Sequence, residues 1–236
     1  MKRILILAAA AAALACGSTS TNNAAVSRNN PGSGSGTLQV QGDINATQTT
    51  GVTPAPAPAT TFSVTVKDGS GANVSGATVT VLNSSVPDGV VNLAEAPAGS
   101  GRYSGTVALF ATGDFQMNVV KGTDTVQGVV VGGPGMAAIN APAVSTTGTT
   151  TVTANQDLAV SWTTPKIAKA VTVATRDMSF SGPDLGFYTI VAAQNVPRLN
   201  SRLRVDRFNE VEAAGGLVGS RLSVMYRVEI NPLNVQ

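Results

Sequence analysis

The chain has no histidine, a single cysteine and few aromatic or charged side chains. Aromatic residues make up 4% of its 236 residues and charged residues 12%. Without histidine, serine–histidine and cysteine–histidine nucleophile activation and the common zinc sites are excluded. Because Cys16 has no second cysteine to pair with, no internal disulfide can form and each core must be held by packing alone.

Carboxylates are the remaining candidates for catalysis. Asp206, Glu210 and Glu212 form the nearest cluster, and a carboxylate pair is what most glycoside hydrolases use. The sequence AAGG follows this cluster, and few aromatic residues lie near it to hold a sugar. We therefore expect no enzymatic activity and no cofactor.

The charge balance argues against a nucleic-acid partner. The formal charge of +2 comes from Lys2 and Arg3, and without them thirteen basic residues face thirteen acidic ones. Phosphate binding needs a concentrated basic surface. From Val152 to Gln236 there are nine basic and seven acidic residues. On alternating strands these predict a solvated outer face, with contact to a polyanionic glycan or lipid headgroup as the alternative.

The N-terminus has the features of an export signal. Lys2 and Arg3 precede an apolar segment of eleven residues, Ile4 to Leu14, and small residues at 13 and 15 suit cleavage before Cys16. The segment is shorter than the about 20 apolar residues that a membrane-spanning helix needs. In one interpretation, Ala-Leu-Ala is an ordinary cleavage site and Cys16 is simply the first mature residue.

In the other interpretation, residues 13 to 16 (ALAC) serve as an anchoring site. They resemble the lipobox of bacterial lipoproteins, although Leu14 lies one place closer to the cysteine than is usual. The resemblance implies removal of residues 1–15, lipidation of Cys16 and attachment to a membrane. Gly17 after the cysteine implies transfer to the outer membrane of a Gram-negative bacterium. Lipidation would also remove an unpaired thiol that otherwise stays reactive.

Residues 16–60 are expected to be the lipidated cysteine and a disordered low-complexity tether. GSTSTNNAAVSRNNPGSGSG is polar and low in complexity, and GVTPAPAPATT ends the segment with Pro-Ala steps typical of polyproline II. Thr37 to Ile44 (TLQVQGDI) alternates apolar and polar residues. This stretch has an alternative interpretation, as an edge strand added to the first domain.

Residues 61–143 predict a first antiparallel β-sandwich domain. Apolar residues alternate with polar ones, and Gly, Asp, Asn or Pro clusters separate the runs at about ten-residue spacing. The expected strands are Phe62–Val66, Ala77–Val81, Tyr103–Leu109, Phe115–Val119 and Thr125–Val131.

Within this unit, VTVKDGSGANVSGATVTV, GRYSGTV and TGDFQMNVV resemble the transthyretin-like or carboxypeptidase-regulatory-like sandwich family. The resemblance implies a non-catalytic accessory module in a secreted protein. We expect Gly76 to take a positive φ where the chain re-enters the sheet. The motif matches at six positions: Asp68, Gly71, Val74, Gly76, Ala77 and Val79.

After a linker at 144–151, residues 152–236 predict a second, immunoglobulin-like β-sandwich. DLAVSWTTP resembles an early strand of fibronectin type III domains, and we expect its Trp162 to pack in the core rather than form an exposed platform. The further strands expected are Ala170–Thr175, Gly186–Ala192, Ser201–Phe208 and Arg221–Ile230. The fold class is therefore all-β, with two antiparallel β-sandwich domains after a signal peptide and disordered tether.

Four aspartates lie in or beside glycine-containing turns: Asp68, Asp88, Asp114 and Asp124. Oxygen ligands in such loops suit calcium, but no D-x-D-x-D spacing is present and aspartate near glycine is common in β-turns. Turn geometry is the favoured interpretation, so no metal site is predicted.

The sequence as a whole predicts a membrane-anchored cell-envelope lipoprotein with a structural, scaffold or adhesion role. Its partners are then the membrane, through Cys16, and another envelope protein. The alternative is an envelope binding protein that recognises a soluble ligand, a glycan or a partner protein through loops at one end of a sandwich.

Overall fold

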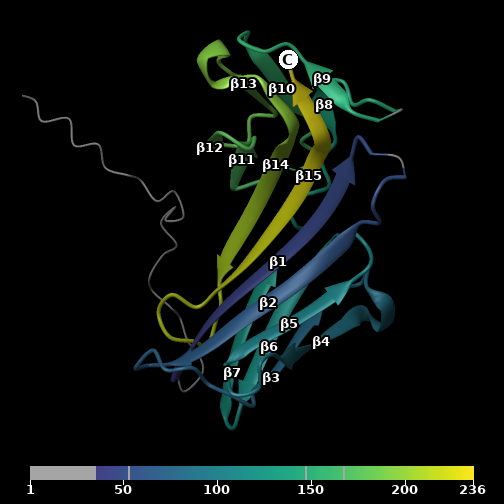
Figure 1. The fold of residues 1–236 in the computed structure, drawn as a ribbon. Helices are drawn as coiled ribbons and strands as arrows, with labels where there is room; N and C mark the ends of the chain where they lie inside the picture. The colour runs from purple at the N-terminus through teal and green to yellow at the C-terminus, as the bar shows by residue number, and fades with distance from the viewer. Residues whose placement is uncertain (1–35, 53, 147, 167) are drawn as a thin grey trace, which may run out of the picture.

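The computed structural model describes residues 36–236 except 53, 147 and 167 (Figure 1). Strands dominate, and the helical elements within these residues are two short 3-10 turns, η1 (Pro87–Gly89) and η2 (Ala192–Gln194). The all-β fold class is thus confirmed. The expected signal peptide, Cys16 and the start of the expected tether lie outside the described residues. Within those residues, no helix is long and apolar enough to cross a membrane.

Fifteen strands are present in the described residues. In chain order they are β1 (Leu38–Thr50), β2 (Ala59–Asp68), β3 (Thr78–Leu82), β4 (Val90–Glu95), β5 (Arg102–Val107), β6 (Phe115–Lys121), β7 (Asp124–Val130), β8 (Ile139–Ala141), β9 (Thr150–Val152), β10 (Leu158–Trp162), β11 (Ala170–Ala174), β12 (Ser179–Gly182), β13 (Phe187–Ile190), β14 (Arg198–Glu212) and β15 (Arg221–Val235).

Twelve of these strands form one sheet, which bends around the first core and continues into the second. Its order is β12-β11-β14-β15-β1-β2-β5-β4-β3-β6-β7, with β9 also paired to β15, and β13-β10-β8 form a separate sheet. Most neighbours are antiparallel, as expected. Two pairs differ, because β1 and β9 each run parallel to β15.

The first core lies where β1, β2 and β5 face β3, β6 and β7. Alternation on each strand buries one side chain in two, as the period of a strand requires. The largest buried members are Tyr103, Tyr226, Phe62 and Phe115.

Tyr103 explains why the two motifs of the first unit occur together. Its hydroxyl accepts a hydrogen bond from the Ala77 amide at 2.8 Å and donates one to the Val74 carbonyl at 3.2 Å. Gly76, between them, has φ of +67°, so the expected positive φ is confirmed. Glu95 accepts a hydrogen bond from the Gly76 amide. The tyrosine of GRYSGTV thus fixes the turn of GANVSGA.

The second core lies between the β13-β10-β8 sheet and the far half of the large sheet. Trp162 is 4% exposed and packs among aliphatic side chains of β11, β14 and β15, so the prediction of core packing is confirmed. Leu203 and Val205 are fully buried, as their alternation predicts. A stacked pair, Phe180 on β12 and Tyr188 on β13, lies between edge strands of the two sheets, with ring centroids 4.1 Å apart.

β14 and β15 serve both cores. On the inward face of β15, Leu222 and Val224 belong to the first core, whereas Val228 and Ile230 belong to the second. The first core therefore contains residues from beyond position 143, where sequence alternation predicted its end. Strands of 15 residues are long enough to pack against two cores in succession.

The structure also differs from the expected tether. Leu38–Thr50 is a central strand rather than an edge strand or a disordered segment, and it pairs with β2 on one side and β15 on the other. Leu38, Val40, Ile44 and Ala46 are buried in the first core. Burial of these four side chains offsets the entropy of ordering a segment whose composition is otherwise polar.

A buried ion pair marks the boundary between the two cores. Arg207 is fully buried on the inward face of β14, and its Nη2 lies 2.5 Å from a carboxylate oxygen of Asp184, whose side chain is also fully buried. Its Nη1 donates to the carbonyls of Pro134 (2.6 Å) and Gly135 (2.8 Å), and Nη2 donates to the carbonyl of Lys166. One side chain thus holds three loops against β14.

The Asp184 carboxylate also accepts two hydrogen bonds from groups other than Arg207. It accepts hydrogen bonds from Trp162 Nε1 at 2.8 Å and from the Ala168 amide at 3.0 Å. Burial alone would raise the pKa of Asp184, but the hydrogen bonds from Arg207, the Ala168 amide and Trp162 together lower it below 3.8. The carboxylate therefore stays ionised against the guanidinium.

Tyr226 on β15 lies opposite Arg207 on β14 in the strand register, and it belongs to the first core. Its ring makes edge contacts with Phe110 and Phe115, at centroid distances of 4.9 and 6.4 Å. Gly133 crosses above it, and a Cβ at that position would lie 2.6 Å from the tyrosine oxygen. Glycine is therefore required where the chain passes from the first core to the second.

The position of β1 gives a test of the first core. Ile44 is 1% exposed, so Ile44→Ala should reduce the free energy of unfolding by about 2–5 kcal/mol. Urea denaturation of the purified protein measures this. Thr47→Ala, on the outward face of the same strand, is the matched control and should change it by no more than about 0.5 kcal/mol. Equal, small effects would mean that β1 is not part of the core.

The boundary gives a second test. Arg207→Leu leaves Asp184 buried without its partner and should cost about 3–5 kcal/mol of unfolding free energy. Arg202→Leu changes an exposed arginine of the same strand and should change it by no more than about 0.5 kcal/mol. In the double variant Arg207→Leu/Asp184→Leu the loss should be smaller than the sum of the two single losses. Additive losses would show that the two groups act separately.

Candidate functional site

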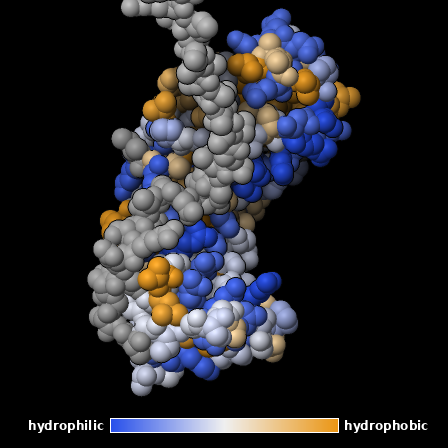
Figure 2. Space-filling model, turned by 90° about the vertical axis from the view of Figure 1, so that its left-hand side faces the viewer, coloured by the Kyte–Doolittle hydropathy of each residue, from blue (hydrophilic) through white to orange (hydrophobic). Residues whose placement is uncertain are grey.

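The outward face of the large sheet carries a largely apolar row of side chains next to a polar one. On this face the register places Ala170, Phe208, Met225 and Asn45 side by side across β11, β14, β15 and β1. The next row is Glu210, Ser223 and Asp43. Figure 2, a view from the left-hand side of Figure 1, shows hydrophilic and hydrophobic residues interspersed outside the grey atoms. The register shows that the outward face likewise combines apolar side chains with polar and charged ones.

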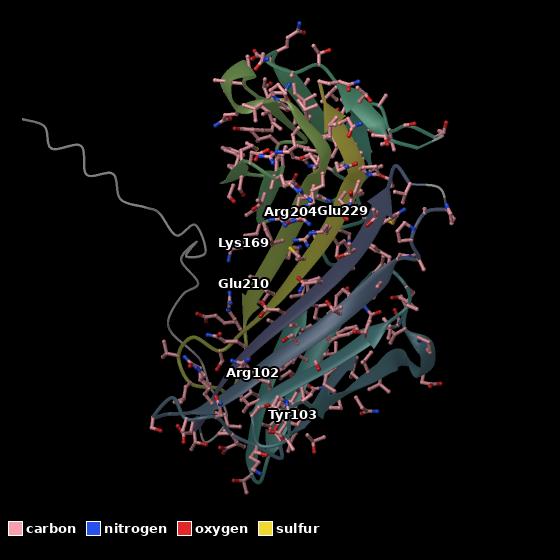
Figure 3. The ribbon with its side chains drawn as sticks, in the orientation of Figure 1. Arg102, Tyr103, Lys169, Arg204, Glu210 and Glu229 are labelled. Carbon is pink, nitrogen blue, oxygen red and sulfur yellow. The ribbon has the colours of Figure 1, made fainter. Side chains whose placement is uncertain are left out.

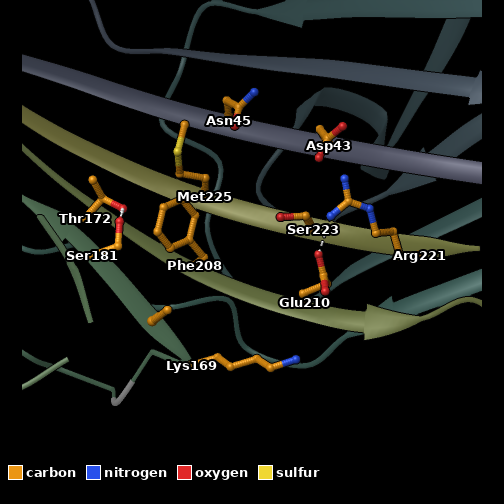
Figure 4. Close-up of a pocket in the computed structure, with 11 residues that line it drawn as sticks. Asp43, Asn45, Lys169, Thr172, Ser181, Phe208, Glu210, Arg221, Ser223 and Met225 are labelled. Carbon is orange, nitrogen blue, oxygen red and sulfur yellow. Dashed lines mark hydrogen bonds and ion pairs between the residues drawn. The ribbon is translucent and has the colours of Figure 1, made fainter. Parts of the chain in front are cut away.

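A groove of about 240 Å³ lies in this face (Figure 4). Its floor is uneven because small side chains adjoin large ones: Ala170 pairs with Phe208 across β11 and β14, and Ser223 pairs with Glu210 across β15 and β14. The lining is Asp43, Asn45, Lys169, Ala170, Thr172, Ser181, Phe208, Glu210, Arg221, Ser223 and Met225.

Two carboxylates and two cations lie in the groove. Arg221 Nη1 is 2.5 Å from Glu210 Oε2. Burial raises the pKa of Asp43 and is the largest effect on it. The Arg221 guanidinium lowers this pKa and the Glu210 carboxyl raises it, so that the pKa of Asp43 lies above its usual 3.8. Lys169 is exposed at the edge, next to Glu210 in Figure 3. The formal charges of the lining cancel.

Beyond the groove, the same face continues as a network of ion pairs. Asp206, 3% exposed, accepts hydrogen bonds from Arg227 Nε (2.7 Å) and Nη2 (2.9 Å). Arg204 Nε is 3.4 Å from the same carboxylate. The hydrogen bonds to Asp206 raise the pKa of Arg227. Opposite charges placed side by side reduce the field that a polyanionic partner would meet.

The three carboxylates considered for catalysis lie along one strand, β14. Asp206 is enclosed by Arg204 and Arg227, and Glu210 is paired with Arg221. Glu212 lies opposite Arg221 in the strand register. The carboxylate oxygens of Asp206 and Glu210 are thus in contact with arginine side chains. The arrangement supplies hydrogen-bonding groups for binding.

The four turn aspartates do not come together. Asp68 accepts hydrogen bonds from the Ser70 amide and hydroxyl, and these, with contacts to the following amides, lower its pKa. Asp114 accepts from the Gly132 amide, whereas Asp88 and Asp124 lie in η1 and at the start of β7. Within the described residues, no group of three or more histidine, cysteine, aspartate or glutamate side chains is placed to hold a metal.

Sequence reasoning missed the groove itself. Composition places Asp43 and Asn45 in the expected tether, and alternation indicates only that Phe208 and Met225 belong to strands. The available signal was the alternation in TLQVQGDINATQTT, which places Asp43 and Asn45 on one face and Ile44 on the other. Once that segment is a strand, its polar face is a candidate surface.

No protein-family model matches the chain, and no curated protein matches it. Among solved structures, the titin immunoglobulin tandem domains A164-A165 share 11% identity over 83% of this chain and 97% of that one, with a TM-score of 0.24. The adhesin InvE of Yersinia pseudotuberculosis shares 15% over 85% and 61%, with a TM-score of 0.26. The D0-D1 domain of intimin shares 16% over 82% and 100%, with a TM-score of 0.24. Such low scores establish neither family nor function.

The raised pKa of Asp43 gives a test of the groove's electrostatics. Since the folded state raises this pKa above 3.8, ionised Asp43 lowers stability, and the loss grows as pH rises through the raised value. Asp43→Asn should therefore be more stable than wild type at pH 7, and the difference should vanish as pH falls towards 3.8. Urea denaturation across pH measures it. A difference that widens on acidification would contradict this assignment, and Glu212→Gln controls for general loss of negative charge.

Proposed function

We propose that this protein is a lipoprotein of the bacterial cell envelope, anchored through Cys16 in the outer membrane of a Gram-negative cell, with a non-catalytic structural, scaffold or adhesion role. The observation that carries the proposal is the position of the only cysteine, directly after an apolar segment with small residues at 13 and 15 and directly before a polar one. An export signal that leaves one thiol at the new N-terminus is best explained by acylation of that thiol.

The fold supports a role as a spacer or display module. The chain enters the first core at the start of β1, and the C-terminus lies at the opposite end of the molecule, beyond the second core (Figure 1). The Arg207–Asp184 pair and the shared strands β14 and β15 join the cores. An anchor at Cys16 would therefore place the first core nearer the membrane and present the second core away from it.

Two local features support assigning the units to families. In the first unit, the Tyr103 hydroxyl bonds to the backbone on both sides of Gly76, and Gly76 has the positive φ expected from the resemblance to the carboxypeptidase-regulatory-like family. In the second, Trp162 packs between two sheets, as in immunoglobulin-like domains. Both families are common as non-catalytic modules, which agrees with the scaffold role.

Anchoring is tested by comparing wild type with Cys16→Ala in a Gram-negative host fed labelled palmitate. Wild type should incorporate the label and partition into the detergent phase of a cloud-point extraction. Cys16→Ala should lose the label and appear in the aqueous phase, because cleavage after Ala15 remains possible.

Ser18→Ala, which keeps Cys16, is the matched control and should behave as wild type. The thiol provides an independent readout: since Cys16 is the only cysteine, denatured mature wild type should not react with a maleimide. A maleimide-reactive wild-type protein in the aqueous phase would rule out the anchor.

A further inference from the structure

We propose that the groove on the outward face of β11, β14, β15 and β1 binds a neutral saccharide. The proposal places recognition on a sheet face and not on the loops at the end of a sandwich. It depends on the groove alone, so it stands or falls separately from the anchor at Cys16.

An apolar ring and hydrogen-bonding groups lie together in the groove. Phe208 is half-buried, with Ala170 beside it on β11 and Met225 on β15. Because Ala170 is small, it leaves space next to the ring. A pyranose ring has C–H groups on its faces and hydroxyls at its edge, so it matches an aromatic side chain bordered by polar groups.

The polar lining includes both donors and acceptors without a formal charge. Asn45 supplies an amide with donor and acceptor ends, and Ser223 supplies a hydroxyl. Thr172 and Ser181 share a hydrogen bond of 2.7 Å in which either oxygen can donate. A hydroxyl pair of this kind can reorient to suit a ligand hydroxyl. Figure 4 shows these groups on both sides of Phe208 and Met225.

The charges of the lining favour a neutral ligand over an acidic one. Arg221 is already engaged by Glu210 at 2.5 Å, and Asp43 lies near it, since Arg221 lowers the pKa of that carboxyl. An anionic ligand would meet both carboxylates. Carboxyl groups and a guanidinium held in fixed positions are instead strong, directional hydrogen-bond partners for hydroxyl groups.

The size and surroundings of the groove suit one unit of a longer chain. Its volume of about 240 Å³ is below the roughly 300–1,000 Å³ typical of sites that enclose a whole drug-sized ligand. The row of Ser223 and Asp43 continues across the sheet through Ser63 on β2 and Ser104 on β5. A bound oligosaccharide can thus extend beyond the groove along a polar face.

The test is titration calorimetry of the purified mature protein in a detergent that has no sugar headgroup. The probes are the hexasaccharides of cellulose, mannan, starch and chitin, and a heparin hexasaccharide as the polyanion. At least one neutral hexasaccharide should bind, and heparin should not. Phe208→Ala should weaken binding of that probe by about tenfold, from loss of the ring contact.

Ser223→Leu fills the groove and should abolish binding without removing any core side chain. Thr106→Ala, on the outward face of β5 but outside the groove, is the matched control and should bind as wild type does. Urea denaturation of each variant checks that it is folded. The proposal is overturned if no neutral hexasaccharide binds, if heparin binds more tightly than all of them, or if folded Ser223→Leu binds like wild type.

Discussion

The buried contact between Arg207 and Asp184 is the constraint on which the arrangement of the molecule depends. A guanidinium and a carboxylate without solvent exposure are costly unless each is fully hydrogen-bonded. Here the arginine donates to two carbonyls of the β7–β8 loop and one of the β10–β11 loop, and the aspartate accepts a hydrogen bond from the Trp162 indole. The geometry of three loops is therefore fixed at one point, and the second core is positioned against the first.

The inward orientation of Arg207 also determines which side chains of β14 line the groove. Arg207 points inward from β14, so its neighbours Asp206 and Phe208 point outward, where they meet Arg227 and Met225 of β15. The groove combines β1, from the N-terminal part of the chain, with β14 and β15, from its C-terminal part. The same strands thus present core side chains on one face and groove side chains on the other. A register shift of one residue would move the core side chains to the outward face and the groove side chains to the core.

Much of the fold follows from alternation in the sequence, but strand partners do not. Period two predicted which faces of β14 and β15 are buried, and it correctly placed Leu203, Val205, Trp162 and Tyr226 in cores. It cannot show that β1 pairs with β15, about 180 residues later, because alternation carries no information on the neighbouring strand. The groove was missed for the same reason: Asp43 and Phe208 become neighbours of one site only through that pairing. The strands β8 and β9 were not predicted because three residues are too few to show a period. The strand β4 was not predicted because its side chains do not alternate between buried and exposed, and β12 was not predicted either.

The parallel pairing of β1 with β15 has a consequence for how the protein matures. A chain is synthesised from the N-terminus onwards, so β1 is present before residues 221–230, with which its second edge pairs. Contacts of such wide sequence separation form slowly. The first core therefore closes only once β15 is available, and until then one edge of β1 is open to other chains.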